Sequence, residues 1–337
     1  MAYIILNKNN FFNNLDIIAN RTKSVDKIAL VLKDNAYGHG LLEMASMANE
    51  YGIKKAVVQK TEEALLIEKF FEYILVLSDT PTVSSDKIRY TINDINSISK
   101  FPLGTKVELK VDSGMHRNGI SPSELEASFL KIKGQGLQLE AVFTHHRSAD
   151  ELTTEWFWQK ENFKKIKQES TKLAEKLGFT ALRFHSSNSA ALFRDSSFDE
   201  DMARVGIVAY GCMTLPKAIS VDGIKPVLSL YANKISSKKL KSGERVGYGA
   251  TREIKSDAVV SNYDFGYGDG FFRSCSNNYK TPHDIEIVGR VSMDNSSFLC
   301  DKDEILIFDD ARVVALYAGT ISYEVLTSLK ADIKKIF

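Results

Sequence analysis

Eight short apolar segments alternate with helical or loop segments over the first two-thirds of the chain, and this alternation restricts the fold more than any other feature. A short apolar run is typical of a buried strand, and strands that alternate with helices favour a parallel sheet. Eight such units in roughly 210 residues predict an α/β fold class with an N-terminal (β/α)8 barrel of the TIM type. The segments are Ile28–Lys33, Ala56–Gln59, Ile74–Ser78, Arg89–Asn93, Val107–Asp112, Leu139–His145, Leu182–Ser186 and Arg204–Tyr210.

The stretches between the predicted strands carry helical signals. Ser121 and Glu124 resemble a helix cap and its capping glutamate, and they predict a helix over Ser121–Lys133. The fourth unit is the weakest, because Ile95–Lys100 has room only for a short helix. Helical spacing also runs through Thr153–Leu177. The apolar face expected of that helix comprises Trp156, Phe157, Phe163, Ile166 and Leu173.

The sequence changes in character after about Asp222, where helical periodicity gives way to strands rich in glycine, tyrosine and serine. This change predicts a C-terminal mainly-β domain that ends in a helical stretch from Ser322 onward. We expect the barrel to span residues 9–222, and the β-domain to comprise 223–337 together with an N-terminal strand in 1–8. The predicted strands are Val227–Ile235, Arg245–Tyr248, Ala258–Val260, Ile285–Val291 and Ile305–Phe308.

The composition argues against several classes of function. A net charge of +1 over 337 residues gives no electrostatic attraction to nucleic acid or to acidic membranes. No stretch approaches the roughly 20 apolar residues of a membrane span, and the N-terminal apolar run is too short for a signal peptide. Cys212, Cys275 and Cys300 are widely spaced without metal-ligand spacing, so we expect reduced thiols, no metal site and a cytoplasmic protein.

Lys33 closes the apolar run Ile28–Leu32, although lysine is among the residues least often buried. Removing an ammonium group from water favours the neutral amine, which can form a Schiff base with an aldehyde cofactor. Tyr37 then offers a hydroxyl, and Gly38 and Gly40 let the backbone approach a ligand closely. A lysine at a strand end is more often a snorkelling surface residue, so the interpretation depends on the whole string.

That ten-residue string, Val31–Gly40, resembles the lysine motif of the alanine racemase family. In that family the lysine holds pyridoxal 5'-phosphate (PLP) and the tyrosine touches its phosphate, which implies these roles for Lys33 and Tyr37. A barrel followed by a β-domain is also the architecture of the family, and the resemblance covers essentially the whole chain.

Other polar residues gather at the C-terminal ends of the predicted strands, where barrel enzymes place their chemistry. A lone histidine or arginine there is usually structural, but the location shared with Lys33 argues against chance. The resemblance implies that Arg117 bonds the PLP phenolic oxygen and helps to hold the substrate carboxylate. Lys110 matches a lysine that many members of the family carry as a carbamate beside that arginine. His145 resembles a histidine that packs near the ring and bonds the catalytic tyrosine.

A second group resembles the family's phosphate site. Asn188 and Ser189 match an asparagine–serine step that binds the phosphate, and Gly206 and Ile207 match positions whose backbone amides face it. Hydroxyl and amide donors suit an anion without net positive charge nearby.

Arg204 determines the reaction class that the resemblance implies. It matches the arginine that faces the PLP pyridine nitrogen, and His185 matches the residue that orients this arginine. A permanent cation there disfavours protonation of the ring, so the cofactor becomes a weaker electron sink and leakage into transamination is limited. PLP decarboxylases of the same barrel fold place an acidic residue at this position instead.

The β-domain is expected to supply the rest of the site. Racemisation needs proton-handling groups on opposite faces of a planar intermediate, and Lys33 can serve only one of them. Tyr248 resembles the family's second catalytic acid/base. In the family this region reaches the barrel of another subunit, so the resemblance implies a homodimer with shared active sites.

Four further residues of the β-domain match family positions near the substrate. Tyr267 and Arg273 lie in a string that lines the entrance, and Met293 and Asp294 lie in one that binds the substrate carboxylate. Aligning Thr320–Val325 with the family's ending places Ala331 where relatives have a tyrosine that touches the phosphate and narrows the entrance. We therefore expect a wider entrance and measurable racemisation of serine beside alanine.

The sequence predicts a PLP-dependent amino-acid racemase that interconverts L- and D-alanine, which by resemblance supplies D-alanine for peptidoglycan. The rivals are a broad-specificity alanine and serine racemase, a barrel-fold PLP decarboxylase and a non-catalytic PLP carrier. Arg204 argues against the decarboxylase, and the β-domain with Tyr248 argues against the carrier, because carriers resemble the barrel alone.

Overall fold

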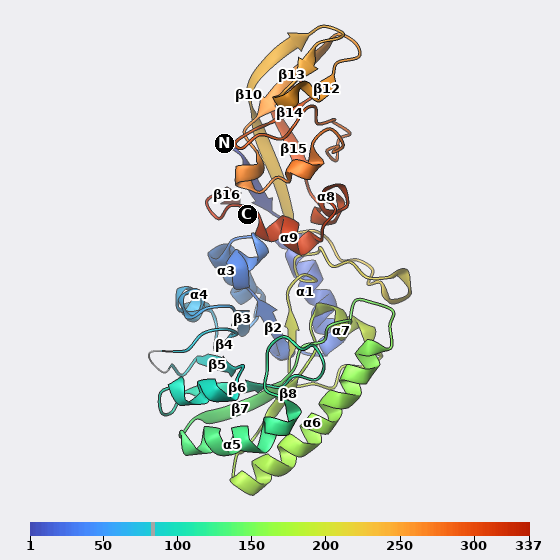
Figure 1. The fold of residues 1–337 in the computed structure, drawn as a ribbon. Helices are drawn as coiled ribbons and strands as arrows, with labels where there is room; N and C mark the ends of the chain where they lie inside the picture. The colour runs from blue at the N-terminus through green and yellow to red at the C-terminus, as the bar shows by residue number, and fades with distance from the viewer. Residues whose placement is uncertain (82–84) are drawn as a thin grey trace.

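The computed structural model describes residues 1–81 and 85–337. Figure 1 shows a barrel at one end of the molecule and a β-rich region at the other, with both chain termini in the β-rich region. The two parts share one continuous core of buried apolar side chains.

The barrel consists of eight parallel strands, each of which overlaps one predicted segment, so the predicted barrel is confirmed. The strands are β2 (Ile28–Val31), β3 (Lys55–Val58), β4 (Tyr73–Val76), β5 (Ile88–Ile92), β6 (Lys106–Lys110), β7 (Gln138–Phe143), β8 (Arg183–His185) and β9 (Ala203–Val205). They pair in the order β8-β7-β6-β5-β4-β3-β2-β9. A hydrogen bond of 2.9 Å from the Arg204 amide to the Ser187 carbonyl links the two ends of this order. β2 and β4 are buried at every position, as expected of strands covered on both faces.

Helices cover the outside of the barrel (Figure 1). They are α1 (Lys8–Thr22), α3 (Leu41–Tyr51), α4 (Thr61–Ile67), α5 (Leu125–Gly134), α6 (Glu155–Leu177) and α7 (Ser189–Arg194). Ser121 and Glu124 form the expected capping box ahead of α5, and Ile95–Lys100 forms only a 3-10 helix. The predicted apolar face of α6 was wrong at Phe157, which is 58% exposed, whereas Gln159 is buried. Among the described residues, no helix is long and apolar enough to cross a membrane.

The C-terminal region is mainly β, as predicted. Its strands are β10 (Leu228–Leu240), β11 (Arg245–Val246), β12 (Arg252–Glu253), β13 (Ala258–Tyr263), β14 (Ser296–Phe298), β15 (Glu304–Phe308) and β16 (Lys334–Ile336), with β1 (Tyr3–Leu6) from the N-terminus. The main sheet has the order β14-β13-β10-β1-β16, β15 also pairs with β10, and β11 and β12 form a separate hairpin. The long strand β10 is therefore the centre of the region.

Three local predictions in this region were wrong. Ile285–Val291 makes only isolated bridges, and Gly289 interrupts the extended backbone with a φ of +76°. Tyr248 begins a 3-10 turn because Gly247 and Gly249, which flank it, have φ values of +71° and +73°. The helical stretch from Ser322 is only α9 (Ser322–Thr327), since the chain then pairs with β1 as β16, and a further helix, α8 (Ala311–Ala318), precedes it.

Figure 1 shows α9 at the junction between the two parts. The turn that follows β2 packs directly against it, because a Cβ atom on Gly38 would lie 2.1 Å from the Leu326 carbonyl oxygen. Gly38 also has a φ of +76°, which favours glycine for a second reason. The C-terminal region thus closes over the same barrel end that carries Lys33.

Candidate active site

A left-handed turn, α2 (Lys33–Tyr37), follows β2 and carries two of the predicted site residues. Asp34, Asn35, Ala36 and Tyr37 have φ values of +52° to +54°. This conformation costs a residue other than glycine about 1–2 kcal/mol. Such strain persists only where the surrounding structure holds it, and it is common at functional sites.

Hydrogen bonds hold both ends of this turn. Tyr210 donates its hydroxyl to the Val31 carbonyl at 2.7 Å, and His39 Nδ1 lies 2.9 Å from the Tyr37 carbonyl. The rings of His39 and Tyr210 stack with centroids 4.5 Å apart. Burial lowers the pKa of His39 to about 4, so the ring is neutral and its Nδ1–H donates to the carbonyl. His39 and Tyr210 together clamp the backbone before and after Lys33.

The environment of Lys33 differs from the sequence prediction. β2 ends at Val31, so Lys33 begins the turn and does not close the strand. Its side chain is 32% exposed and its ammonium lies 3.4 Å from Asp34 Oδ2. The expected desolvation of Lys33 is therefore not found in the single chain, because the left-handed turn brings the side chain into the open mouth of the barrel.

Neutral donors gather beside the turn. Ser189 Oγ accepts a hydrogen bond of 3.0 Å from the Gly206 amide, and Asn188 caps α7 through its side chain. A Cβ atom on residue 206 would lie 2.8 Å from the Tyr37 hydroxyl, so only glycine leaves this space open. Burial raises the pKa of Tyr37, which keeps its hydroxyl a donor. With the amide of Ile207, these groups form a cradle of the kind that binds anions.

Arg204 lies at the end of a buried hydrogen-bond chain. Tyr73 donates to Glu108 at 2.6 Å, His185 Nε2 lies 2.9 Å from Glu108, and His185 Nδ1 contacts Arg204 Nη1. Because Glu108 can only accept, His185 carries its proton on Nε2 and accepts from Arg204 through Nδ1. Arg204 also donates to the Thr144 carbonyl at 2.7 Å. This series of hydrogen bonds holds a neutral His185 against the cationic Arg204.

Lys110 lies among other cations. Burial, Arg204 and Arg117 together lower its pKa to about 8, and Asp112 opposes them. Burial and then Arg204 hold the pKa of His145 well below 6.5, so this ring is neutral. Arg117 is exposed at the rim. The mouth therefore contains one lysine that loses its proton more easily than usual and one histidine that does not gain one.

These residues face a single cavity of about 740 Å³ at the C-terminal ends of the strands. Ten of the eleven site residues predicted in the barrel line this cavity, and the eleventh, His185, lies behind Arg204. The ten are Lys33, Tyr37, Lys110, Arg117, His145, Asn188, Ser189, Arg204, Gly206 and Ile207.

Tyr323, from α9, also lines this cavity and was missed by the sequence analysis. Its ring packs against that of Tyr37, with centroids 5.9 Å apart. The segment Thr320–Val325 held the signal, but the expected tyrosine was sought eight residues further on. Ala331 does not line the cavity, so the predicted widening of the entrance by Ala331 was wrong.

The predicted residues of the β-domain lie elsewhere in the same chain. Tyr248, Tyr267, Arg273 and Met293 line a shallow concavity of about 560 Å³ that shares no lining residue with the barrel cavity. Tyr248 is 69% exposed and Met293 is 56% exposed. Asp294, the neighbour of Met293, does not line this concavity. One chain therefore presents the two predicted halves of the site on separate surfaces.

Comparison with known proteins identifies the family of this chain. The model of the alanine racemase N-terminal domain matches residues 6–214, and that of the C-terminal domain matches residues 227–337. An alanine racemase of Nitratiruptor sp. is 46% identical over 99% of both chains, and one of Campylobacter curvus is 42% identical over the full length of both. The crystal structure of alanine racemase from Bacillus anthracis with bound L-Ala-P has a TM-score of 0.89 at 27% identity, covering 100% of this chain and 94% of that one.

The fold and the strand-end cavity define a barrel enzyme whose cavity holds a lysine beside a cradle of neutral hydrogen-bond donors. The chain belongs to the alanine racemase family.

Proposed function

We propose that this protein is a PLP-dependent racemase that interconverts L- and D-alanine. One observation carries the proposal: a single cavity holds Lys33 between an anion cradle at one side and the buried Glu108–His185–Arg204 chain at another. Each relative named above is called an alanine racemase, which supports alanine as the substrate.

The residues of the cavity fit PLP. The space that a Cβ on Gly206 would fill, with the hydroxyls of Tyr37 and Ser189 beside it, suits a phosphate group. Arg204 retains an Nε–H donor with no acceptor among the described residues, which suits a ring nitrogen that is not protonated. When bound, PLP supplies an aldehyde for an amine and a conjugated ring that spreads the electron pair left when Cα loses its proton.

Lys33 is the residue that would hold PLP and then move the proton at Cα on one face of the substrate. Tyr248 would give or take the proton on the opposite face. His145 is neutral and can accept a hydrogen bond from that tyrosine. Arg117 would bind the substrate carboxylate from the barrel side, with Met293 and Asp294 from the β-domain side.

These roles require a second copy of the chain. Tyr248 and the barrel cavity share no surface within one chain, and an exposed tyrosine lacks the water-excluded setting that proton transfer at carbon favours. We propose a head-to-tail homodimer in which the β-domain of each subunit closes the barrel of the other. The same covering would desolvate Lys33.

Two measurements test the proposal. Borohydride treatment in the presence of PLP should leave a pyridoxyl group on the peptide that contains Lys33, as read by mass spectrometry. Incubation with separate L-amino acids, followed by chiral chromatography, should give D-alanine as the main product. An adduct on another lysine, or no D-alanine, would show that the proposal is wrong.

The physiological role follows from the same proposal. We place the reaction in the cytoplasm, where D-alanine would be supplied for peptidoglycan. Serine racemisation loses the support that Ala331 gave it, because Tyr323 keeps an aromatic ring at the cavity. A decarboxylase of this fold would have an acidic group at the ring nitrogen. Arg204, held by His185, argues against that activity.

A further inference from the structure

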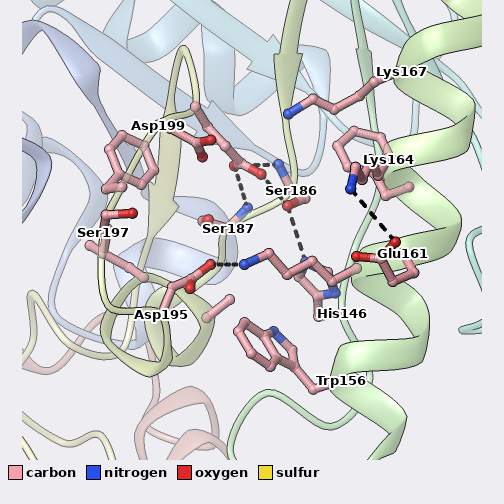
Figure 2. Close-up of a pocket in the computed structure, with 16 residues that line it drawn as sticks. His146, Trp156, Glu161, Lys164, Lys167, Ser186, Ser187, Asp195, Ser197 and Asp199 are labelled. Atoms are coloured by element: carbon pink, nitrogen blue, oxygen red, sulfur yellow. Dashed lines mark hydrogen bonds and ion pairs between the residues drawn. The ribbon is translucent and has the colours of Figure 1, made fainter.

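A second cavity of about 380 Å³ lies behind the active site, between α6 and the chain that leads into β9 (Figure 2). The wall between the two cavities is the 186–189 loop. Ser186 and Ser187 face the outer cavity, whereas Asn188 and Ser189 face the active site. The loop that forms part of the anion cradle is therefore reachable from behind.

Glu200 holds this loop from the outer side. Its carboxylate is buried and accepts from the Ser186 amide at 2.7 Å, from the Ser187 amide at 2.9 Å and from the Ser186 hydroxyl. No basic side chain of the described residues forms an ion pair with it. Burial alone would raise the pKa of Glu200, but these hydrogen bonds outweigh burial and leave the pKa below 4.5. Two backbone amides and one hydroxyl of the same loop are thus the hydrogen-bond partners of this buried anion.

The same loop is held on its inner side by Arg204. The Arg204 amide donates to the Ser187 carbonyl at 2.9 Å, and its guanidinium donates to the Ser186 carbonyl at 3.3 Å. Two consecutive residues therefore have their amides fixed by Glu200 and their carbonyls fixed by Arg204. The next two residues, Asn188 and Ser189, belong to the cradle.

The donor and acceptor roles in this network follow from Glu200, which can only accept. Ser186 donates its hydroxyl to Glu200, so its Oγ accepts from His146 Nε2–H at 3.0 Å, a contact drawn in Figure 2. His146 Nδ1 has no partner among the described residues. The side-chain oxygen of a glutamine at position 200 can still accept from both amides. Its NH₂ group would then face Ser186, whose hydroxyl can turn and donate to His146 if that ring changes tautomer. Glutamine is therefore the conservative replacement at this position.

We infer that Glu200 is a positioning residue for the cofactor phosphate: it fixes the 186–189 loop from behind, so that the cradle is formed before PLP binds. The inference rests on the proposed PLP dependence. Without the carboxylate, two amide donors lose their acceptor and the loop must reorganise to satisfy them. Loss of Glu200 should therefore weaken the contacts to the cofactor phosphate and leave the contact between Arg204 and the cofactor ring in place.

The experiment compares PLP with pyridoxal, which lacks the phosphate. Full-length protein freed of PLP is titrated with each compound, and the dissociation constant is read from the change in absorbance. Glu200→Ala is expected to weaken PLP binding at least about tenfold and to leave pyridoxal binding unchanged. Glu200→Asp, which is too short to reach both amides, should give an intermediate loss, and Glu200→Gln should stay within about threefold of the wild type.

Asp199→Asn is the matched control, because Asp199 is the exposed neighbour of Glu200 and accepts no hydrogen bond from the loop. At saturating PLP, the KM for alanine of the Glu200 variants should equal that of the wild type. If Glu200→Ala does not fold, Glu200→Asp carries the test.

Equal losses for PLP and pyridoxal, or a lower melting temperature with unchanged PLP affinity, would overturn the inference and leave the proposed function intact. A wild-type protein that binds no PLP would overturn the proposed function itself.

Discussion

The barrel cavity and the β-domain concavity differ in how their functional side chains are held. In the barrel, Arg204 is 6% exposed and is fixed by His185 and by backbone carbonyls. In the β-domain, Tyr248 is 69% exposed and its hydroxyl has no hydrogen-bond partner among the described residues. One chain therefore holds the side chains of its barrel cavity in place, whereas Tyr248 in the β-domain concavity is open to solvent.

The most direct test of this difference inactivates the barrel cavity in one variant and the β-domain concavity in another. Lys33→Ala and Tyr248→Phe should each lower kcat by about 10²–10⁴-fold or more, since each removes one proton-handling group. Refolding the two variants together should restore roughly a quarter of the wild-type activity. Random pairing makes half of the dimers mixed, and each mixed dimer has one intact site. Activity is measured as D-alanine formed per total amount of refolded dimer.

Separately refolded variants, mixed only afterwards, serve as the control for subunit exchange. No recovery in verified mixed dimers would mean that Lys33 and Tyr248 act within one chain, or that Tyr248 does not transfer a proton.

A second test compares buried and exposed ion pairs. Glu108 is fully buried and its carboxylate lies 3.0 Å from Arg183, so Glu108→Gln should cost about 3–5 kcal/mol in the free energy of unfolding. In the β-domain, Arg245 and Glu253 lie 2.9 Å apart but are 58% and 52% exposed. Glu253→Gln should cost no more than about 1 kcal/mol. Urea unfolding measures both, and equal costs would contradict the comparison.

The buried pair also predicts a pH dependence. Burial alone would raise the pKa of Glu108, but His185 and Arg183 outweigh it and lower the pKa to about 2. A carboxyl with a lowered pKa stabilises the fold above its unfolded value near 4.5, and this contribution is lost as the pH falls toward 2. The wild type should therefore lose roughly 3 kcal/mol more than Glu108→Gln over this interval. Parallel pH curves for the two proteins would show that Glu108 is not the responsible group.

The sequence predicted the barrel well because its signals are local. Each strand is a short apolar run, and the capping residues Ser121 and Glu124 mark the start of a helix. The residues of the barrel cavity follow from the same rule, since parallel strands bring their C-terminal ends to one edge.

Predictions failed where distant parts of the chain decide the structure. Lys334–Ile336 forms a strand only because β1 lies beside it, which no nearby residue indicates. The left-handed turn after β2, which leaves Lys33 partly exposed, depends on Tyr210, far along the chain. Tyr323 reaches the cavity only because α9 packs on the turn at Gly38. The buried partner of the 186–189 loop, Glu200, likewise carries no local signal.

A fourth prediction concerns Lys110, a cation of the barrel mouth whose pKa is lowered. Its pKa of about 8 leaves roughly a tenth of the amine neutral at pH 7, and this form adds CO₂ to give a carbamate and release a proton. The carbamate would replace repulsion from Arg117 and Arg204 with attraction. Wild-type protein in ¹³C-bicarbonate should show a carbamate resonance that Lys110→Gln lacks, and the variant should lose at least about tenfold in kcat/KM. An active wild type with no such resonance would mean that Lys110 acts as a free amine.

The smallest expected effect lies where the two regions meet, at the entrance under α9. Tyr323 is 39% exposed, but partial desolvation raises the pKa of its hydroxyl to about 12, and its ring packs on Tyr37. Tyr323→Leu should therefore loosen the entrance and raise serine turnover relative to alanine turnover by about fivefold, the low end of what an apolar pocket discriminates. Ala331→Tyr should leave this ratio unchanged, because residue 331 does not line the cavity. Chiral chromatography with both substrates measures the ratio. If Ala331→Tyr changes the ratio of serine to alanine turnover and Tyr323→Leu does not, then residue 331 lines the entrance and Tyr323 only contributes packing.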